Sequence, residues 1–279
     1  MPLEPQPAVD HGSERSDPEA RAGHLVVLLH GQPGGPEIWR AVEARLAGRG
    51  LRVLAVDRPG YGGSPHEPGG FVHNAAVLGD LIEEHGGPAV VVAHSWAAGA
   101  AIVAAGRSPA RIDGLVLCAP VGDPSSVSRL DRLLGRTRVG RSVLRAGLAA
   151  GGWLVSRPGG ARLMPRAGLG DLGDGETRAA SRPARDGRAR RAAAVEQAAL
   201  VEEVLEVVAA APYVRVATFV LTGRDDTVVA PAAAAALAER VPGAQLIELD
   251  GGHLVPLEHP AAVVESVLQL VAAEGPAGP

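Results

Sequence analysis

Residues 90–99 read VVVAHSWAAG, an apolar β-branched run that meets a serine and continues at once into an alanine- and glycine-rich segment. This pattern predicts a strand, a sharp turn with Ser95 at its apex, and a helix. In the G-x-S-x-G elbow, the serine occupies a strained strand-to-helix turn that exposes its hydroxyl above the sheet. The residues two before and two after that serine must be small, and here they are Ala93 and Ala97. The alternative interpretation is a serine N-cap on an ordinary helix.

The composition narrows the classes of protein. A chain of 279 residues is long enough for one large domain, or for a core with an insertion. The net charge of −4 gives no general attraction to nucleic acid, and the single cysteine, Cys118, excludes an internal disulfide and a cysteine-based zinc site. No apolar run reaches about 18 residues, and residues 1–23 lack the apolar core of a secretory signal. We therefore expect a cytoplasmic protein without a nucleic-acid or membrane partner, a metal or another cofactor, while its oligomeric state stays open.

Apolar runs recur along the chain and alternate with helical patterns. The runs predict strands at 24–29, 51–56, 89–93, 112–118, 217–222 and 246–249, and helices are expected at 38–48 and 72–84. This alternation predicts an α/β fold with a doubly wound, mostly parallel sheet. Active sites of such sheets lie at the carboxyl ends of the strands, where His30, Asp57 and Ser95 fall.

The strand rhythm stops between the fourth and fifth predicted strands. We expect a core made of residues 24–121 and 212–272, a helical cap insertion at 122–211, and flexible tails at 1–23 and 273–279. Over 122–200 the chain carries 15 arginines against 7 acidic residues. This local positive charge indicates either a solvated face opposite an acidic core, which we favour, or a preference for an anionic substrate.

A serine nucleophile needs a general base, and few histidines follow the elbow. His253 lies in a glycine-containing loop after the last predicted strand, whereas His259 begins a helix and fits a structural or capping role. We therefore expect His253 to be the base. We expect His94 to pack or bond locally beside the serine, and His30 to brace the glycine loop that follows it.

The base in turn needs a carboxylate that fixes its tautomer. The loop after the fifth predicted strand offers Asp225 and Asp226, and either of them could instead cap the next helix. Asp123, shortly after the fourth strand, is a third option. Spacing by itself does not choose among them.

Five segments in this order resemble one known family: HGQPGG (30–35), DRPGYGGSP (57–65), AHSWAAG (93–99), TGRDDTVVAP (222–231) and GGHLVPLEHP (251–260). Over about residues 24–270 they are similar to the α/β-hydrolase fold superfamily, in its serine esterase and epoxide-hydrolase-like branch with a helical cap. The resemblance implies that Ser95, Asp226 and His253 form a catalytic triad, because Gly223 and Pro231 align Asp226 with the acid position of the family. It further implies an oxyanion hole made by the backbone N–H groups of Gln32 and Trp96.

The implied activity is hydrolysis of a carboxylic ester, or a lactone or related acyl bond, of a small molecule. Haloalkane dehalogenases and epoxide hydrolases of this branch use an aspartate nucleophile, so the serine at position 95 does not carry their activity over. A C–C bond hydrolase, an aminopeptidase and a tailoring enzyme of secondary metabolism remain alternatives with the same triad. A hydrolase-fold protein that binds without turnover is an alternative of another class. The string GYGG at 60–63 does not fit the dinucleotide fingerprint, so no NAD site is predicted.

Overall fold

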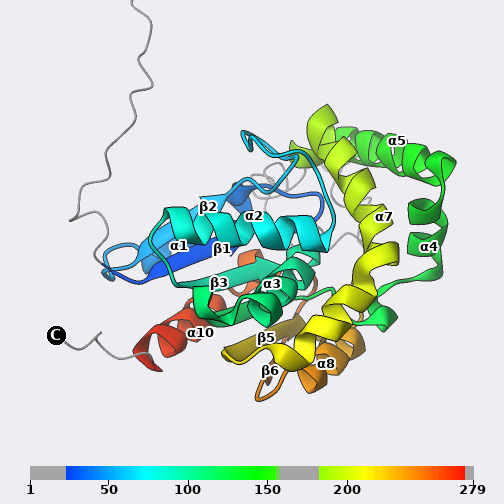
Figure 1. Cartoon of the computed structure of the whole chain (residues 1–279). Helices are drawn as coiled ribbons and strands as arrows, with labels where there is room; N and C mark the ends of the chain where they lie inside the picture. Colours follow the sequence, from blue (N-terminus) through cyan, green and yellow to red (C-terminus); the bar gives the residue numbers. More distant parts are fainter. Residues whose placement is uncertain (1–22, 156, 158–181, 274–279) are drawn as a thin grey trace, which may run out of the picture.

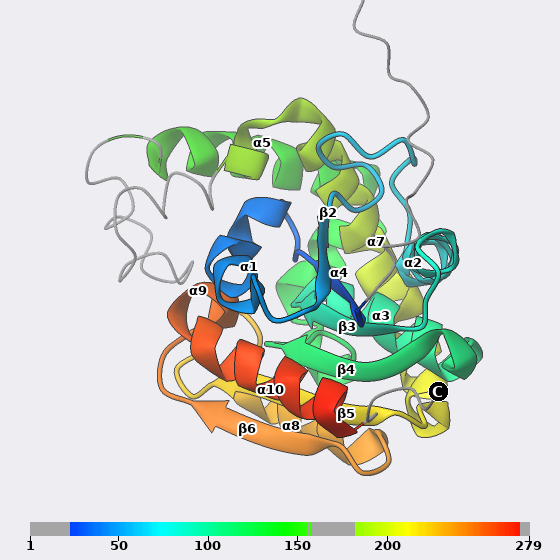
Figure 2. The same cartoon turned by 90° about the vertical axis from the view of Figure 1, so that its left-hand side faces the viewer.

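A computed structural model of the chain describes residues 23–155, 157 and 182–273. Its six strands form one sheet in the order β2-β1-β3-β4-β5-β6, and every neighbouring pair is parallel (Figures 1 and 2). The expected α/β fold with a doubly wound sheet is therefore confirmed. The strands are β1 (Leu25–Leu29), β2 (Arg52–Val56), β3 (Ala89–His94), β4 (Ile112–Cys118), β5 (Ala217–Gly223) and β6 (Gln245–Leu249).

β1 is apolar along its whole length, as is β3 up to His94, because both faces of these central strands are covered. Val27 of β1 packs into a core layer with α2 (Phe71–Glu84), α3 (Trp96–Arg107) and α8 (Pro231–Arg240). Its neighbour Val26 points to the other face, which α1 (Arg40–Leu46) and α10 (Pro260–Ala273) cover (Figure 2). The helix expected at 38–48 is a 3-10 turn at Pro36–Trp39 that continues into α1.

The strand register brings the carboxyl ends of the central strands level with one another. Leu29 at the end of β1 pairs with Ala93 of β3, and His94 pairs with Cys118 of β4. Cys118 and Leu221 of β5 continue the same line. The loops that follow these strands therefore emerge at one edge of the sheet, where the candidate site lies. The remaining short elements are 3-10 turns and one helical turn: Pro109–Arg111, Pro124–Ser126, Ala211–Tyr213 and α9 (Val255–Glu258).

Between β4 and β5 the chain forms α4 (Arg129–Arg136), α5 (Arg138–Val155) and α7 (Gly187–Ala210), which we call the insertion helices. Figure 1 shows α7 running beside the core, with α4 and α5 on its outer side. The C-terminal half of α7, with Leu200, Val204 and Val207, packs into the core layer that holds α2 and α3. Of the two expected tails, all residues but Gly23 and Ala273 lie outside the described ranges, as does the part of the insertion at 158–181. None of the described helices is long and apolar enough to cross a membrane.

Candidate active site

Ser95 lies at the turn between β3 and α3 with φ 54° and ψ −119°, in the left-handed region that a serine rarely adopts. Neighbouring backbone groups hold this turn: Ser95 N–H donates to the Cys118 carbonyl at 2.8 Å, and Val121 N–H donates to the Ser95 carbonyl at 3.1 Å. Ala93 and Ala97 are fully buried where strand and helix meet. The Ser95 hydroxyl makes no capping hydrogen bond to α3, all of which the structure describes. The interpretation as an ordinary N-cap is therefore wrong, and Ser95 sits on a strained elbow.

The structure brings Ser95, His253 and Asp226 into one hydrogen-bonded chain. His253 Nε2 lies 2.9 Å from Ser95 Oγ, and His253 Nδ1 lies 2.7 Å from Asp226 Oδ2. The other carboxylate oxygen of Asp226 accepts the backbone N–H groups of Val228 at 2.8 Å and Val229 at 2.9 Å. The three residues are only 5–8% exposed, so their hydrogen bonds are shielded from water.

The other candidates for the base and the acid lie outside this chain of contacts. Asp225, the neighbour of Asp226, is exposed. Asp123 caps the 3-10 turn at Pro124–Ser126 and forms an ion pair with Arg240 at 2.8 Å. His259 Nε2 bonds the backbone carbonyl of Asp250. Asp226 is thus the aspartate that contacts His253, a distinction that spacing in the sequence does not make.

Two further buried histidines support the loops of the site. His30 Nδ1–H donates to the Gly31 carbonyl at 2.9 Å, and its Nε2 accepts the Arg58 backbone N–H at 3.2 Å, so it braces the glycine loop as expected. The contact of His94 is not local, because its Nε2–H donates at 2.9 Å to the carbonyl of His253, 159 positions away in the chain. Burial and the proximity of Arg58 hold the pKa of His30 well below its ordinary value. Burial, together with the nearby His253, lowers the pKa of His94 to about 3.

Gln32 and Trp96, the residues expected to supply an oxyanion hole, flank Ser95. Trp96 is the first residue of α3, where backbone N–H groups have no partner within a helix and carry positive partial charge. Gln32 lies in the loop after β1, and this loop passes close to the elbow. A Cβ added to Gly31 would lie only 3.1 Å from the Cβ of Ser95. Gly31 therefore lies so close to the serine that even a methyl group at this position would crowd it.

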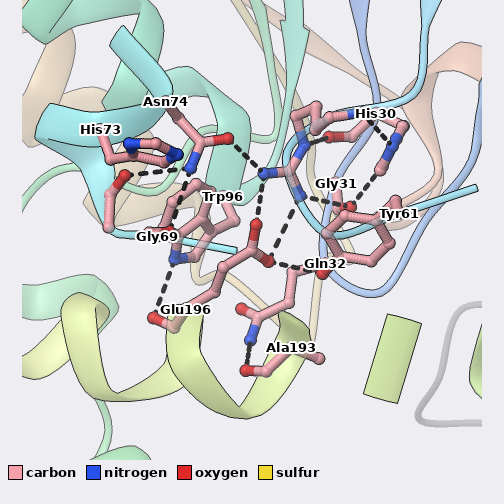
Figure 3. A network of polar contacts seen from close by, with 12 residues as sticks. His30, Gly31, Gln32, Tyr61, Gly69, His73, Asn74, Trp96, Ala193 and Glu196 are labelled. Atoms are coloured by element: carbon pink, nitrogen blue, oxygen red, sulfur yellow. Dashed lines mark hydrogen bonds and ion pairs between the residues drawn. The ribbon is translucent and has the colours of Figure 1, made fainter. Parts of the chain in front are cut away.

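A buried polar network beside the site was not predicted from the sequence (Figure 3). The guanidinium of Arg58 and the carboxylate of Glu196, on α7, form an ion pair at 2.5 Å, with side chains 2% and 0% exposed. Tyr61 Oη–H donates to Glu196 Oε2 at 2.6 Å, and Arg58 Nη1–H donates to Asn74 Oδ1 at 3.2 Å. Burial raises the pKa of Glu196, against the opposing effect of Arg58. One signal of this pair was present in the sequence, because Glu196 interrupts an alanine-rich apolar stretch.

Within the described ranges, no group of three or more His, Cys, Asp and Glu side chains is placed to hold a metal ion. The only described thiol, that of Cys118, is buried, and burial raises its pKa far above its ordinary value. The site, as described, presents a serine hydroxyl with an imidazole and a carboxylate behind it.

The chain is similar to a known protein family and to several individual proteins. Residues 26–266 match the model of the alpha/beta hydrolase family. Among curated proteins, epoxide hydrolase B of Mycobacterium tuberculosis is 38% identical over 104 residues, which are 36% of this chain and 29% of that protein. The matched region thus spans under a third of the relative's length.

Solved structures are similar over most of the chain. Haloalkane dehalogenase DbeA from Bradyrhizobium elkani USDA94 is 26% identical and superposes with a TM-score of 0.70 over 92% of each chain. A thermophilic esterase from Thermogutta terrifontis is 22% identical, with a TM-score of 0.69 over 90% of each chain. The enol-lactonase from Burkholderia xenovorans LB400 is 22% identical, with a TM-score of 0.64 over 94% of each chain. The last two likenesses show a shared fold.

Proposed function

The chain belongs to the alpha/beta hydrolase family, and from that premise we propose that it is a serine hydrolase that cleaves a carboxylic ester, or a lactone or related acyl bond, of a small molecule. One observation carries the proposal: a strained serine whose hydroxyl lies 2.9 Å from an imidazole that is itself bonded to a buried carboxylate. A serine hydroxyl is a weak nucleophile at neutral pH and becomes effective when an adjacent base removes its proton.

The reaction would proceed through an acyl-enzyme. Ser95 Oγ attacks the carbonyl carbon while His253 Nε2 accepts the hydroxyl proton, and Asp226 stabilises the imidazolium that forms. His253 then returns this proton to the leaving alcohol as the C–O bond breaks. A water molecule, deprotonated by His253, attacks the acyl-enzyme, and the acid and free Ser95 are released. The N–H groups of Gln32 and Trp96 would stabilise the tetrahedral oxyanion, and each such donor contributes about 3–4 kcal/mol in comparable sites.

The serine distinguishes this proposal from the activities named for two of the relatives, a dehalogenase and an epoxide hydrolase. If a serine attacked an alkyl halide or an epoxide, the product would be an ether. An ether lacks the acyl carbon at which water can release an ester intermediate, so the serine would stay blocked. An acyl donor avoids this problem, and we therefore propose acyl transfer rather than alkyl transfer.

A serine-directed probe tests the proposal directly. We expect a fluorophosphonate to label the wild-type chain on the peptide that carries Ser95, and we expect hydrolysis of short p-nitrophenyl esters. Ser95→Ala should abolish both. Ser266→Ala is the matched control, because Ser266 is also buried but its hydroxyl bonds the Ala262 carbonyl within α10. Absence of labelling in the wild type would favour the hydrolase-fold binding protein instead.

We propose that residues 122–211 form a helical cap over the site and so shape the substrate pocket. The type of bond that is cleaved is then found by comparing substrates. A panel of esters, lactones, aminoacyl amides and C–C substrates, with and without a carboxylate group, separates the ester proposal from the peptidase and C–C hydrolase alternatives. A preference for the carboxylated members would point to the arginine-rich insertion.

A further inference from the structure

The side chains of Gln32 and Trp96 both reach the same turn of α7 (Figure 3). Gln32 Nε2–H donates to the carbonyl of Ala193 at 2.5 Å, and Trp96 Nε1–H donates to the carbonyl of Glu196 at 3.1 Å. The two residues proposed to bind the oxyanion through their backbone are thus fixed to the insertion through their side chains.

The Arg58–Glu196 pair adds a second connection to the same loop. Arg58 Nε–H donates to the His30 carbonyl at 2.6 Å, and Nη2–H donates to the Gly31 carbonyl at 3.0 Å. Its remaining donors reach Asn74 Oδ1 and both carboxylate oxygens of Glu196. The planar fork of arginine matches these acceptors, whereas the compact ammonium of a lysine could not reach all of them at once.

The contact with the Gly31 carbonyl bears directly on the proposed oxyanion hole. The C=O of Gly31 and the N–H of Gln32 belong to the same planar peptide unit, in which they point in opposite directions. A donor bound to the Gly31 oxygen therefore fixes the direction of the Gln32 N–H. Because the guanidinium is charged, it also polarises this peptide and strengthens its N–H as a donor. His30 Nδ1–H donates to the same oxygen from a second side.

Glu196 holds the guanidinium in this position. Its carboxylate is fully buried, and it accepts from Arg58 on both oxygens and from Tyr61 on one of them. Burial and the proximity of Glu196 raise the pKa of Tyr61 well above its ordinary value, so the phenol keeps the proton that it donates. The ring of Trp96 completes the packing, since it lies 4.9 Å from the guanidinium carbon and stacks on Phe71.

We propose that Arg58 and Glu196 are positioning residues for the oxyanion hole: Arg58 orients and polarises the Gly31–Gln32 peptide, and Glu196 holds Arg58 from α7. The inference rests on the proposed acyl transfer. Its consequence is that α7 is part of the catalytic geometry, so a change in the insertion alters the rate of the chemical step and not only substrate binding.

Glu196→Gln is the first test, with kcat, KM and the inhibition constant of a trifluoromethyl ketone as readouts. Such a ketone forms a hemiketal with Ser95 whose charged oxygen occupies the oxyanion hole. We expect kcat to fall about 10- to 100-fold, less than the full loss of one oxyanion donor. The inhibition constant should rise by a similar factor while KM changes less than about 3-fold. Glu206→Gln is the matched control: Glu206 is also on α7, ten positions after Glu196, and pairs with Arg107 at 2.7 Å, but both side chains are about half exposed.

A double variant keeps the test valid if Glu196→Gln fails to fold, since it leaves a buried charge without its partner. Arg58→Met combined with Glu196→Met removes both charges and retains similar volume. We expect this variant to be folded by circular dichroism and to show the same fall in kcat and in affinity for the ketone. The single variant Arg58→Lys keeps a positive charge but not the planar fork, and we expect kcat and affinity for the ketone to fall in it as well.

The outcomes separate the inference from the function on which it rests. If the wild type reacts with a fluorophosphonate at Ser95 and the folded variants keep kcat and ketone affinity within about 3-fold, the inference is wrong and the serine hydrolase stands. If kcat and KM change together with the melting temperature while ketone affinity holds, the network is structural only and the inference is again wrong. If the wild type does not react, both proposals fail.

Discussion

The imidazoles of His94 and His253 lie side by side, with ring centroids 4.9 Å apart, and His94 Nε2–H donates to the backbone carbonyl of His253 at 2.9 Å. Within the described part of the chain, nothing is placed to hydrogen-bond the other ring nitrogen of His94, which is buried. If His94 took up a second proton, the new N–H group would have no hydrogen-bond acceptor, and its positive charge would lie beside the proposed base, His253. His94 serves as a neutral donor that anchors the His253 loop.

This arrangement predicts how stability depends on pH. The pKa of His94 is about 3 in the folded protein and about 6.5 in the unfolded chain, so the unfolded state binds more protons between these values. The stabilisation is complete above pH 6.5 and is lost as the pH falls toward 3. Between pH 7 and pH 5 we expect the free energy of unfolding to fall by about 2 kcal/mol from His94. His30, whose pKa is also lowered, acts in the same direction.

Urea unfolding at pH 7 and pH 5 measures this difference, and His94→Asn supplies the comparison because an asparagine does not titrate. The difference between the two pH values should shrink by about 2 kcal/mol in the variant. An unchanged difference would show that His94 is not a source of the pH dependence.

Asp226→Asn should lower kcat by as much as about 10⁴-fold, because an amide cannot hold His253 in the tautomer that accepts the serine proton. Asp225→Asn is the control, since Asp225 is adjacent in the chain but exposed. Steady-state kinetics on one p-nitrophenyl ester decides between the two. A large loss in Asp225→Asn and none in Asp226→Asn would contradict the hydrogen-bonded chain described above.

Gly31→Ala should impair activity through crowding at the elbow. The added Cβ would lie 2.8 Å from His94 Nδ1 and 3.1 Å from Ser95 Cβ, so the loop and the serine must move apart. Displacements of this size cost up to about 10²-fold in kcat. Gly147→Ala on α5 is the matched control, because an added Cβ there meets nothing within 4 Å. Equal activity of both variants would mean that the loop adapts without consequence.

Asp123→Ala should reduce stability and leave the active site intact. Asp123 Oδ1 accepts the Ser125 N–H at 2.8 Å, and its Oδ2 pairs with Arg240 at 2.8 Å. Burial alone would raise the pKa of Asp123, but the hydrogen bonds from Ser125 and Arg240 outweigh it and lower the pKa. We expect a loss of about 1–2 kcal/mol in urea unfolding, typical of a lost cap, with kcat unchanged. A fall in kcat would contradict this prediction and would make Asp123 a candidate for the catalytic acid again.

The strand pattern and the elbow could be predicted because they depend on local chemistry. Continuous apolar runs mark strands that are covered on both faces, and small residues around a serine mark the place where a strand and a helix approach closely. The order of the helices and strands then gave the parallel sheet, and with it the edge at which the serine would lie. The choice between Asp225 and Asp226 needed the family resemblance, since neighbouring aspartates are equivalent in spacing.

The partners of the buried charges could not be predicted in this way. Arg58 and Glu196 are 138 positions apart, and neither has a local signal that names the other. His94 likewise looked like a residue with local contacts, yet its hydrogen bond reaches the loop of His253. By itself, the sequence determined the alternation of strands and helices and the residue types at the end of each strand. Runs and periods of apolar residues along the chain reflect which side chains are buried, so these features can be read locally. Only the tertiary structure decided which insertion carboxylate meets Arg58 and which loop His94 contacts, because a buried polar group takes its partner from whatever the folded chain brings next to it.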